Sequence, residues 1–346
     1  MDALLSPRRR HVIAALGAAA LGAACGARQG ARVESLRFGG ETMGSTYSVR
    51  IAGGPFDGAF EAAAQGAVNA AFDDVVRRMS TYDAGSELGR FNRHASTAPF
   101  ALSVDTLAVL ARGQEVAALS GGAFDVTVAP LVAAWGFGAG ASTRGEAPTA
   151  AALAVPLGWR QLALDPLTGT ARKALPGLQA DLSGIAKGYA VDRAAQALQA
   201  LGVERYMVEA GGEIRTRGLN REGRPWQIAI ERPDAWPQQA HRIVALQGLA
   251  MATSGDYRNF YERDGRRISH EIDPATREPV AHRLASVTVV HEECMFADAM
   301  ATALIVLGPE RGPALARERD VAALFIVRDG DGALRDLASP AFAALA

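Results

Sequence analysis

Apolar residues recur at helical spacing in several stretches of this chain. The period in 59–79 is that of a long amphipathic helix, and 104–120 and 295–307 share it. Another helix is predicted after Ser183, a suitable N-cap, because apolar positions continue at this spacing up to Gly202. Glycine is typical of the position after a helix end. The pattern therefore predicts well-defined helices at these places.

Strand patterns are more numerous than helical ones. Residues 38–51 predict a hairpin around Met43-Gly44-Ser45, and Asp264-Gly265 predicts a tight hairpin turn because both residues tolerate positive φ angles. Periodicity does not decide whether 123–128 is a short strand or a buried turn, and the polar, Ala-rich stretch 139–155 predicts a surface insertion. Further strands are predicted within 159–181 and at 206–209, 214–217, 226–231, 242–249, 286–290 and 322–327.

The balance of these elements predicts the fold class. Strands outnumber helices and come largely as hairpins, which favours an α+β fold with antiparallel or mixed sheets flanked by helices over a doubly wound parallel sheet. A chain of 346 residues is long enough to bury a large core. We expect one folded domain over 37–346.

The N-terminus has the features of an export signal. Arg8-Arg9-Arg10 precedes the apolar, small-residue stretch 12–24, which at about 13 residues is too short to span a bilayer permanently. The pair Arg9-Arg10 also resembles a twin-arginine signal. Cys25 resembles a lipoprotein cleavage site, although Gly22 stands where Leu is usual. We expect a signal peptide over 1–24, a tether over 25–36 and an exported protein, lipid-anchored at Cys25 on the periplasmic side of the inner membrane. The alternative is cleavage after a small residue, which would give a soluble periplasmic protein.

Charge and cysteine content narrow the possible partners. The 36 Lys and Arg nearly balance the 37 Asp and Glu, and a net charge of −1 argues against a nucleic-acid-binding surface, which would carry a basic excess. If Cys25 is acylated or removed, Cys294 is the other of the chain's 2 cysteines and has no partner for a disulfide. Cys294 is expected to be a buried small apolar residue.

Lys187 lies in the first turn of the helix predicted after Ser183. A helix N-terminus carries partial positive charge, so a lysine there is favourable if an anion such as a phosphate binds beside it. The alternative is a solvated lysine on an ordinary amphipathic helix. Gly211-Gly212 between two predicted strands permits either close backbone approach to a ligand or a bulge.

Asp298 and Thr302 lie four residues apart in the predicted helix 295–307 and therefore share one face. An unpartnered aspartate on so apolar a helix would be costly to bury, and a hard cation such as Mg²⁺ would resolve that cost. The alternative is that Asp298 caps a helix that starts later. His270 follows the Asp264-Gly265 turn and faces inward by alternation, either as a hydrogen-bonded core residue or as a general base.

Eight short motifs, which include the candidate residues above, follow one another along the chain. Their residues and their order resemble the ApbE family of periplasmic FAD:protein FMN transferases. The motifs are Glu41–Ser45, Met79–Asp83, Gly122–Thr127, Asp181–Asp192, Glu209–Glu213, Thr253–Tyr257, Ser269–Pro274 and Ala297–Thr302.

The resemblance implies an enzyme that binds FAD and Mg²⁺, cleaves the pyrophosphate, joins FMN through a phosphoester to a threonine of an acceptor protein, and releases AMP. It implies that His270 takes the proton of that threonine, and that Asp298, Thr302 and the main-chain carbonyl of Gly184 hold the metal. The implied acceptor is a membrane redox-complex subunit or another exported flavoprotein. The residues implied to contact FAD are Met43, Tyr82, Ala123, Phe124, Asp125, Asp181, Lys187 and Ile272.

Two residues depart from the family pattern. Ala301 stands where some members have a second aspartate, which leaves one carboxylate from this helix for the metal, and Arg277 stands where glycine is common. Two rival functions stay open at this point: hydrolysis of FAD to FMN and AMP with water as acceptor, and a flavin-binding lipoprotein without turnover. His270, Asp298 and Thr302 speak against a pure binding protein.

Overall fold

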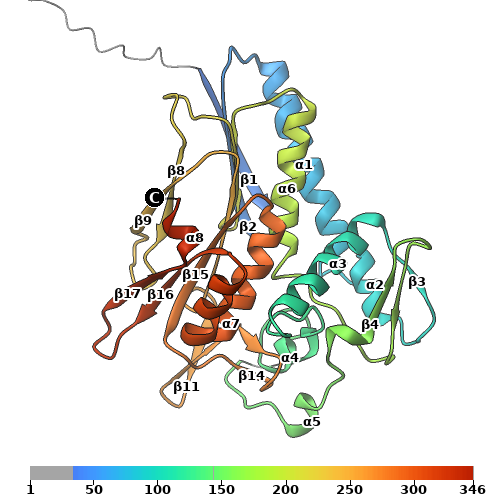
Figure 1. Cartoon of the computed structure of the whole chain (residues 1–346). Coiled ribbons are helices and arrows are strands. Elements are labelled where there is room, and N and C mark those ends of the chain that lie inside the picture. The colour runs from blue at the N-terminus through green and yellow to red at the C-terminus, as the bar shows by residue number, and fades with distance from the viewer. Residues whose placement is uncertain (1–33, 143, 346) are drawn as a thin grey trace, which may run out of the picture. The chain divides into compact units, whose positions relative to one another are not determined.

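The computed structural model describes residues 34–142 and 144–345, and its centre is a fully antiparallel sheet (Figure 1). The 8 strands follow the order β1-β2-β6-β7-β10-β15-β16-β17. This confirms the α+β prediction and decides between antiparallel and mixed pairing in favour of the former. The strands are β1 Ser35–Thr42, β2 Ser45–Ala52, β6 Tyr206–Ala210, β7 Glu213–Arg217, β10 Ala250–Gly255, β15 Leu284–His291, β16 Ala322–Arg328 and β17 Leu334–Ala338.

Helices cover one face of this sheet. The helices α1 (Gly58–Met79), α6 (Ala186–Ala200) and α7 (Cys294–Glu318) pack there, with α6 between the other two (Figure 1). Their apolar sides meet alternate residues of the strands, such as Val208 and Val289, in the main core. This layer fixes the N-terminus of α6 against the first turns of α7.

A smaller layer covers the opposite face of the sheet. It consists of the two-stranded sheet β8 (Trp226–Glu231) and β9 (Ala240–Leu246) and the short helix α8 (Pro340–Ala343). The intervening positions of the central strands, among them Met207 and Leu324, point into this second core. Strands β15 and β16 are buried on both faces and lack the polar side that a solvated strand would show, whereas the edge strands β1 and β17 are mostly exposed.

The remaining elements surround one end of the sheet. The sheet β3-β5-β4 adjoins α2 and α3, and the hairpins β11-β12 and β13-β14 lie near α4, where Trp135, Ile268 and Ile272 form a third apolar cluster. These elements are α2 Glu87–Arg93, β3 Phe100–Ala101, α3 Val104–Leu119, α4 Ala129–Ala134, α5 Ala150–Leu153, a 3-10 turn Trp159–Gln161, β4 Leu162–Asp165, β5 Thr170–Lys173, β11 Phe260–Arg263, β12 Arg266–Ser269, β13 Ile272–Asp273 and β14 Glu278–Pro279.

Two predicted helix boundaries need correction. Ser183 is not the N-cap of α6: its N–H donates to Oδ1 of Asp181 at 2.7 Å, a turn follows, and the N-cap is Ile185. The helix predicted over 295–307 does end there, because Gly308 has φ 79° and is not helical, but a second helical segment continues α7 beyond this kink. Residues 123–128 form turns rather than a strand.

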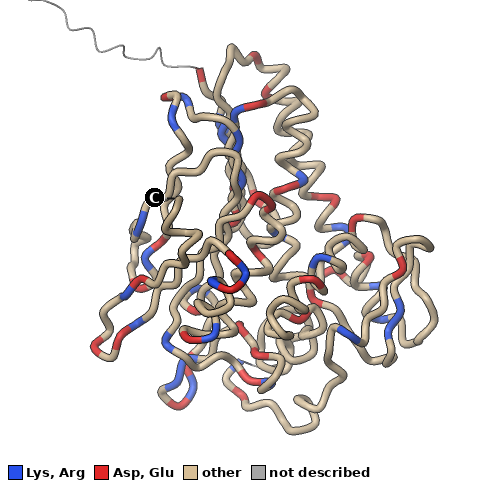
Figure 2. The backbone as a smooth tube through the Cα atoms, in the orientation of Figure 1, with Lys and Arg blue, Asp and Glu red and all other residues tan. Residues whose placement is uncertain are grey.

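Charges of both signs are interspersed along the backbone (Figure 2). Within 34–142 and 144–345, no helix is both long and apolar enough to cross a membrane. The signal peptide, Cys25 and most of the tether lie outside the described residues. Cys294 is fully buried at the start of α7, as expected for a small apolar residue.

Candidate functional site

A cleft of about 500 Å³ opens where the N-terminus of α6, the N-terminal half of α7, β10 and the loops after α3 and β12 converge. This volume lies in the range of small-molecule sites. All the predicted site residues line it except Met43, which packs against the main core and whose contact with a flavin stays a prediction. The lining residues that the sequence predicted are Tyr82, Ala123, Phe124, Asp125, Asp181, Gly184, Lys187, His270, Ile272, Asp298 and Thr302.

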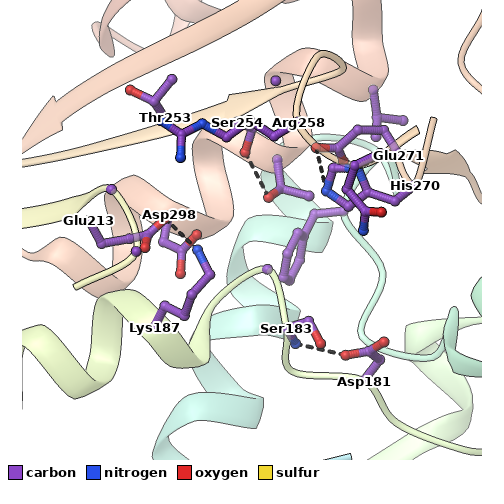
Figure 3. Close-up of a pocket in the computed structure, with 18 of the residues that line it drawn as sticks. Asp181, Ser183, Lys187, Glu213, Thr253, Ser254, Arg258, His270, Glu271 and Asp298 are labelled. Atoms are coloured by element: carbon purple, nitrogen blue, oxygen red, sulfur yellow. Dashed lines mark hydrogen bonds and ion pairs between the residues drawn. The ribbon is translucent and has the colours of Figure 1, made fainter. Parts of the chain in front are cut away.

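Lys187 forms an ion pair with Glu213 at the floor of the cleft (Figure 3). The Nζ–Oε1 distance is 2.5 Å, and Glu213 lies directly after the Gly211-Gly212 turn between β6 and β7. Burial alone would lower the pKa of Lys187, but the carboxylates of Glu213 and Asp298 overcome this effect and raise it. Lys187 is therefore charged and held in place, rather than solvated on an outer helix face.

Asp298 faces the N-terminus of α6 from α7. Its Oδ2 accepts a hydrogen bond of 2.9 Å from the N–H of Gly188. The sequence predicted an anion such as a phosphate at the N-terminus of this helix, and in the structure the carboxylate of Asp298 lies there. A Cβ on Gly188 would lie 2.4 Å from the carbonyl oxygen of Cys294, so glycine is what allows the two helices to approach this closely. The alternative that Asp298 caps its own helix is wrong, because α7 begins at Cys294.

Thr302 lies one helical turn beyond Asp298 and also faces α6. A Cβ on Gly184 would be only 3.1 Å from Oγ1 of Thr302, so the backbone of Gly184 closely approaches this hydroxyl. Oγ1 of Thr302 is also 3.1 Å from Oγ of Ser254 on β10. Ser254 belongs to the Thr253–Tyr257 motif, lies in β10 and lines the cleft.

His270 directly follows β12 and has a side chain that is 35% exposed. Its Nδ1 lies 3.1 Å from the carbonyl oxygen of Asn259. Because a carbonyl oxygen only accepts hydrogen bonds, Nδ1 carries the hydrogen and Nε2 keeps a free lone pair. The neutral ring is thus fixed in the tautomer that a general base at Nε2 requires.

Glu271 is a buried acid beside this histidine. Its Oε1 lies 3.7 Å from Nε2 of His270, too far for a hydrogen bond but close enough for an ion pair when the ring is protonated (Figure 3). Burial raises the pKa of Glu271, since desolvation disfavours the carboxylate. A positive charge arriving at His270 would be stabilised by this group.

Asp125 holds the cleft wall together. Its Oδ1 accepts hydrogen bonds from the N–H and Oγ1 of Thr127, at 2.8 and 2.6 Å, and its Oδ2 accepts one from the N–H of Trp159 at 3.0 Å. Burial raises the pKa of Asp125. Tyr82, by contrast, is 74% exposed at the rim, where an aromatic face is free to stack on a planar ligand.

Sequence reasoning missed the partners of the predicted site residues. Glu213, Asn259 and Glu271 act through contacts with Lys187 and His270, described above. In the sequence, Glu213 and Glu271 are charged residues within strand-like or turn patterns, and these patterns do not predict that the two side chains are buried. Asn259 contributes a main-chain carbonyl, for which the side chain gives no signal.

Asp192 is a further missed residue, and it caps α7 from a neighbouring helix. Its carboxylate accepts hydrogen bonds from the N–H groups of Cys294 and Met295, at 3.1 and 2.9 Å, and pairs with Arg215. This satisfies N–H groups that the helix itself leaves free. Asp192 thereby helps to set the position of α7, and with it Asp298.

The two departures from the family pattern differ in their surroundings. Ala301 is fully buried. Arg277 has φ 63°, a conformation that favours glycine, and its Nη1 donates to the carbonyl oxygens of Leu153 and Val155 at 2.5 and 3.0 Å. Arg277 therefore ties the predicted insertion to the loop that follows His270.

Comparison with known proteins identifies the family of this chain. The ApbE family matches residues 43–325. An FAD:protein FMN transferase of Vibrio cholerae serotype O1 is 43% identical over 318 residues, which are 89% of this chain and 92% of the relative. The solved structure of the flavin transferase ApbE from Vibrio cholerae has a TM-score of 0.82 at 42% identity and covers 91% of this chain and 100% of its own. The apo form of the Pseudomonas stutzeri flavinyl transferase ApbE has a TM-score of 0.82 at 40% identity, with 90% and 97% covered. This chain belongs to the ApbE family.

Proposed function

We propose that this protein is an FAD:protein FMN transferase that moves FMN from FAD to a threonine hydroxyl of an acceptor protein and releases AMP. One observation carries the proposal: motif residues from distant parts of the chain, among them Asp125, Lys187, His270 and Asp298, line one cleft. Membership of a family whose curated relatives bear this name supports it.

The cleft also suits a divalent cation. Asp298 is a buried carboxylate whose one hydrogen bond among the described residues comes from Gly188, and burial raises its pKa. Oε2 of Glu213 is buried with no hydrogen-bond partner in the described part of the chain. Excess buried negative charge of this kind is relieved by a cation.

We assign the cation to Asp298, Thr302 and the carbonyl of Gly184, and propose that it is Mg²⁺. Within 34–142 and 144–345, no three acidic, histidine or cysteine side chains gather around a common metal position. The hydroxyl, the main-chain carbonyl, water and the phosphate oxygens of FAD would therefore complete the ligand set beside the one carboxylate. When bound, Mg²⁺ neutralises pyrophosphate charge and makes phosphorus easier to attack.

His270 is the proposed general base. Nε2, left unprotonated by the Nδ1–H bond to Asn259, takes the threonine proton while the threonine oxygen forms a bond to the FMN phosphorus. The bond from that phosphorus to the oxygen bridging to AMP breaks, and AMP leaves with its electron pair. The carboxylate of Glu271 then stabilises the imidazolium.

We also propose that the protein is exported and anchored to the membrane. A signal at 1–24 and a lipid on Cys25 would hold the enzyme at the periplasmic face of the inner membrane, near acceptors in membrane redox complexes. The mass of the mature N-terminus tests this. A mature chain that starts with acylated Cys25 would support it, and one that starts at an unmodified residue after Cys25 would reject the anchor.

The decisive test incubates the purified protein with FAD, Mg²⁺ and a membrane and periplasmic extract of the host. We expect a polypeptide to gain covalent flavin fluorescence in a denaturing gel, with an FMN-sized mass increase on threonine and an equal amount of AMP. Chelation by EDTA should stop both. AMP release with unmodified polypeptides would instead indicate the hydrolase, and FAD binding without AMP would indicate a binding protein.

A further inference from the structure

A second hollow lies beside the cleft, and we call it the lateral groove. Its volume is about 510 Å³, and it is formed by the loop between β8 and β9, the loop between β10 and β11, and one side of the β11-β12 hairpin. The groove residues used below are Trp236, Tyr257, Arg258, Phe260 and Arg267.

The lateral groove adjoins the cleft. Glu231, Tyr257 and Arg258 line both hollows. Nε of Arg258 lies 3.2 Å from Oε2 of Glu231, and the Tyr257 hydroxyl donates to the same oxygen at 3.3 Å. The next residue, Asn259, supplies the carbonyl that orients His270. A molecule lying in the groove would therefore end beside the proposed general base.

The groove presents groups that protein partners use for recognition. Trp236 is 91% exposed, an unusual state for a large aromatic side chain. The guanidinium of Arg267 lies 4.3 Å from the ring centre of Phe260 and 3.7 Å from Asp256, but both Asp256 oxygens already accept hydrogen bonds from Arg328, at 2.8 and 2.7 Å. The guanidinium of Arg267 therefore has N–H groups that can donate to a bound partner. Tryptophan, tyrosine and arginine are the residues enriched at interface hot spots.

The predicted flavin contacts other than Met43 line the cleft, and none of them lies in the lateral groove. The second substrate is a polypeptide, and its threonine must reach Nε2 of His270 from a supported segment. We propose that the lateral groove docks the polypeptide segment next to the acceptor threonine, with Trp236 as its main anchor and Arg267 as a hydrogen-bond donor. This inference rests on the proposed transferase function.

Trp236→Ala tests the proposal with the flavinylated polypeptide identified in the extract as the probe. Transfer is measured against acceptor concentration by in-gel flavin fluorescence, and FAD affinity by fluorescence titration. We expect kcat/KM for the acceptor to fall roughly tenfold or more, chiefly through KM, while the FAD dissociation constant stays unchanged. Arg267→Ala should lower kcat/KM less, and Trp236→Phe should restore part of it.

Leu167→Ala is the matched control, since Leu167 is an apolar side chain that is 98% exposed in the turn between β4 and β5. It should transfer at the wild-type rate. Unchanged acceptor kinetics in Trp236→Ala would overturn the proposal, and weakened FAD binding would assign the groove to FAD instead. If the wild-type protein flavinylates no polypeptide, the transferase function fails first and the docking inference falls with it.

Discussion

The N–H of Gly188 donates to Oδ2 of Asp298 over 2.9 Å and joins the N-terminus of α6 to the first turns of α7. This bond places the proposed metal carboxylate beside Lys187, which belongs to the same helix turn as Gly188. It depends on a close approach of two helices, so the geometry of the site and the stability of the core are coupled.

Gly188→Ala should therefore destabilise the protein. The new Cβ would lie 2.4 Å from the carbonyl oxygen of Cys294 and 2.8 Å from Cβ of Asp298, and backbone cannot yield as a side-chain tip would. We expect a loss of about 1–3 kcal/mol, measured by urea unfolding. Gly66→Ala in α1 is the control: a Cβ there has no atom of the described chain within 4 Å, and the change should stabilise by about 0.5–1 kcal/mol. Equal effects of the two variants would contradict the steric argument.

Asp298→Asn should abolish stabilisation by Mg²⁺. The amide keeps an oxygen for the N–H of Gly188 but loses the charge that attracts a cation. For the wild-type protein, Mg²⁺ at a hundredfold excess over its dissociation constant should add about 2.7 kcal/mol to the free energy of unfolding, seen as a rise in Tm. Asp165→Asn, at an exposed site on β4, should keep the full rise. If Mg²⁺ raised the Tm of Asp298→Asn as much as that of the wild type, Asp298 would not be a ligand of the metal.

His270→Ala should retain FAD binding and lose transfer. Removing a general base typically lowers the rate by about 10²–10⁴-fold, and we expect this loss in single-turnover flavinylation of the acceptor. His241→Ala is a suitable control, because this histidine pairs with Asp336 at the edge of the sheet, away from the cleft residues. Undiminished transfer by His270→Ala would remove His270 from the mechanism.

Glu271→Gln should change how stability depends on pH. Burial raises the pKa of Glu271 in the folded protein above the ordinary value of 4.5, so the folded state binds more protons than the unfolded chain above that pH. The contribution of this group to stability therefore falls as pH rises from about 4.5 through its folded pKa. In metal-free buffer, Tm of Glu271→Gln should match the wild type near pH 4 and exceed it at pH 8. A gap that does not grow with pH, or that Glu262→Gln at an exposed site reproduces, would disprove this.

Arg277→Gly should loosen the 144–155 segment without unfolding the domain. The change removes two hydrogen bonds from a charged donor, to Leu153 and Val155, each worth about 1.5–3 kcal/mol where formed, but relieves a positive φ that costs about 1–2 kcal/mol. The hydrogen bonds outweigh the strain, so stability should fall, and limited proteolysis within this segment should become faster. Arg266→Ala, at the tip of the β11-β12 hairpin, should leave cleavage there unchanged.

Local chemistry explains what could be predicted from the sequence. Residues Asp264 and Gly265 do form the tight turn, with φ 52° and 70°, because the conformation is a property of these two residues. The helix with Asp298 and Thr302 on one face follows from spacing alone. Such features need no knowledge of distant parts of the chain.

Tertiary contacts explain most of what could not be predicted. The sequence indicated a phosphate partner for Lys187, but in the structure Lys187 pairs with Glu213, which belongs to a separate hairpin. The capping of α7 by Asp192 likewise joins residues far apart in sequence. Neither of these pairs is marked by a local pattern. The error at Ser183 is local instead: its N–H donates to the Asp181 carboxylate in a turn, and the helix starts at Ala186.

The strand order also determines at what point of synthesis the site can be complete. The N-terminal hairpin leaves the ribosome first, but β2 pairs with β6, where Tyr47 lies opposite Ala210, and β6 is made much later. The site then still lacks Asp298, which comes with α7 near the end of synthesis. Long-range antiparallel pairing of this kind folds slowly and after the partners are present. The nascent chain therefore has no early foldable half that already carries a working site, and activity appears only once nearly the whole polypeptide has been made.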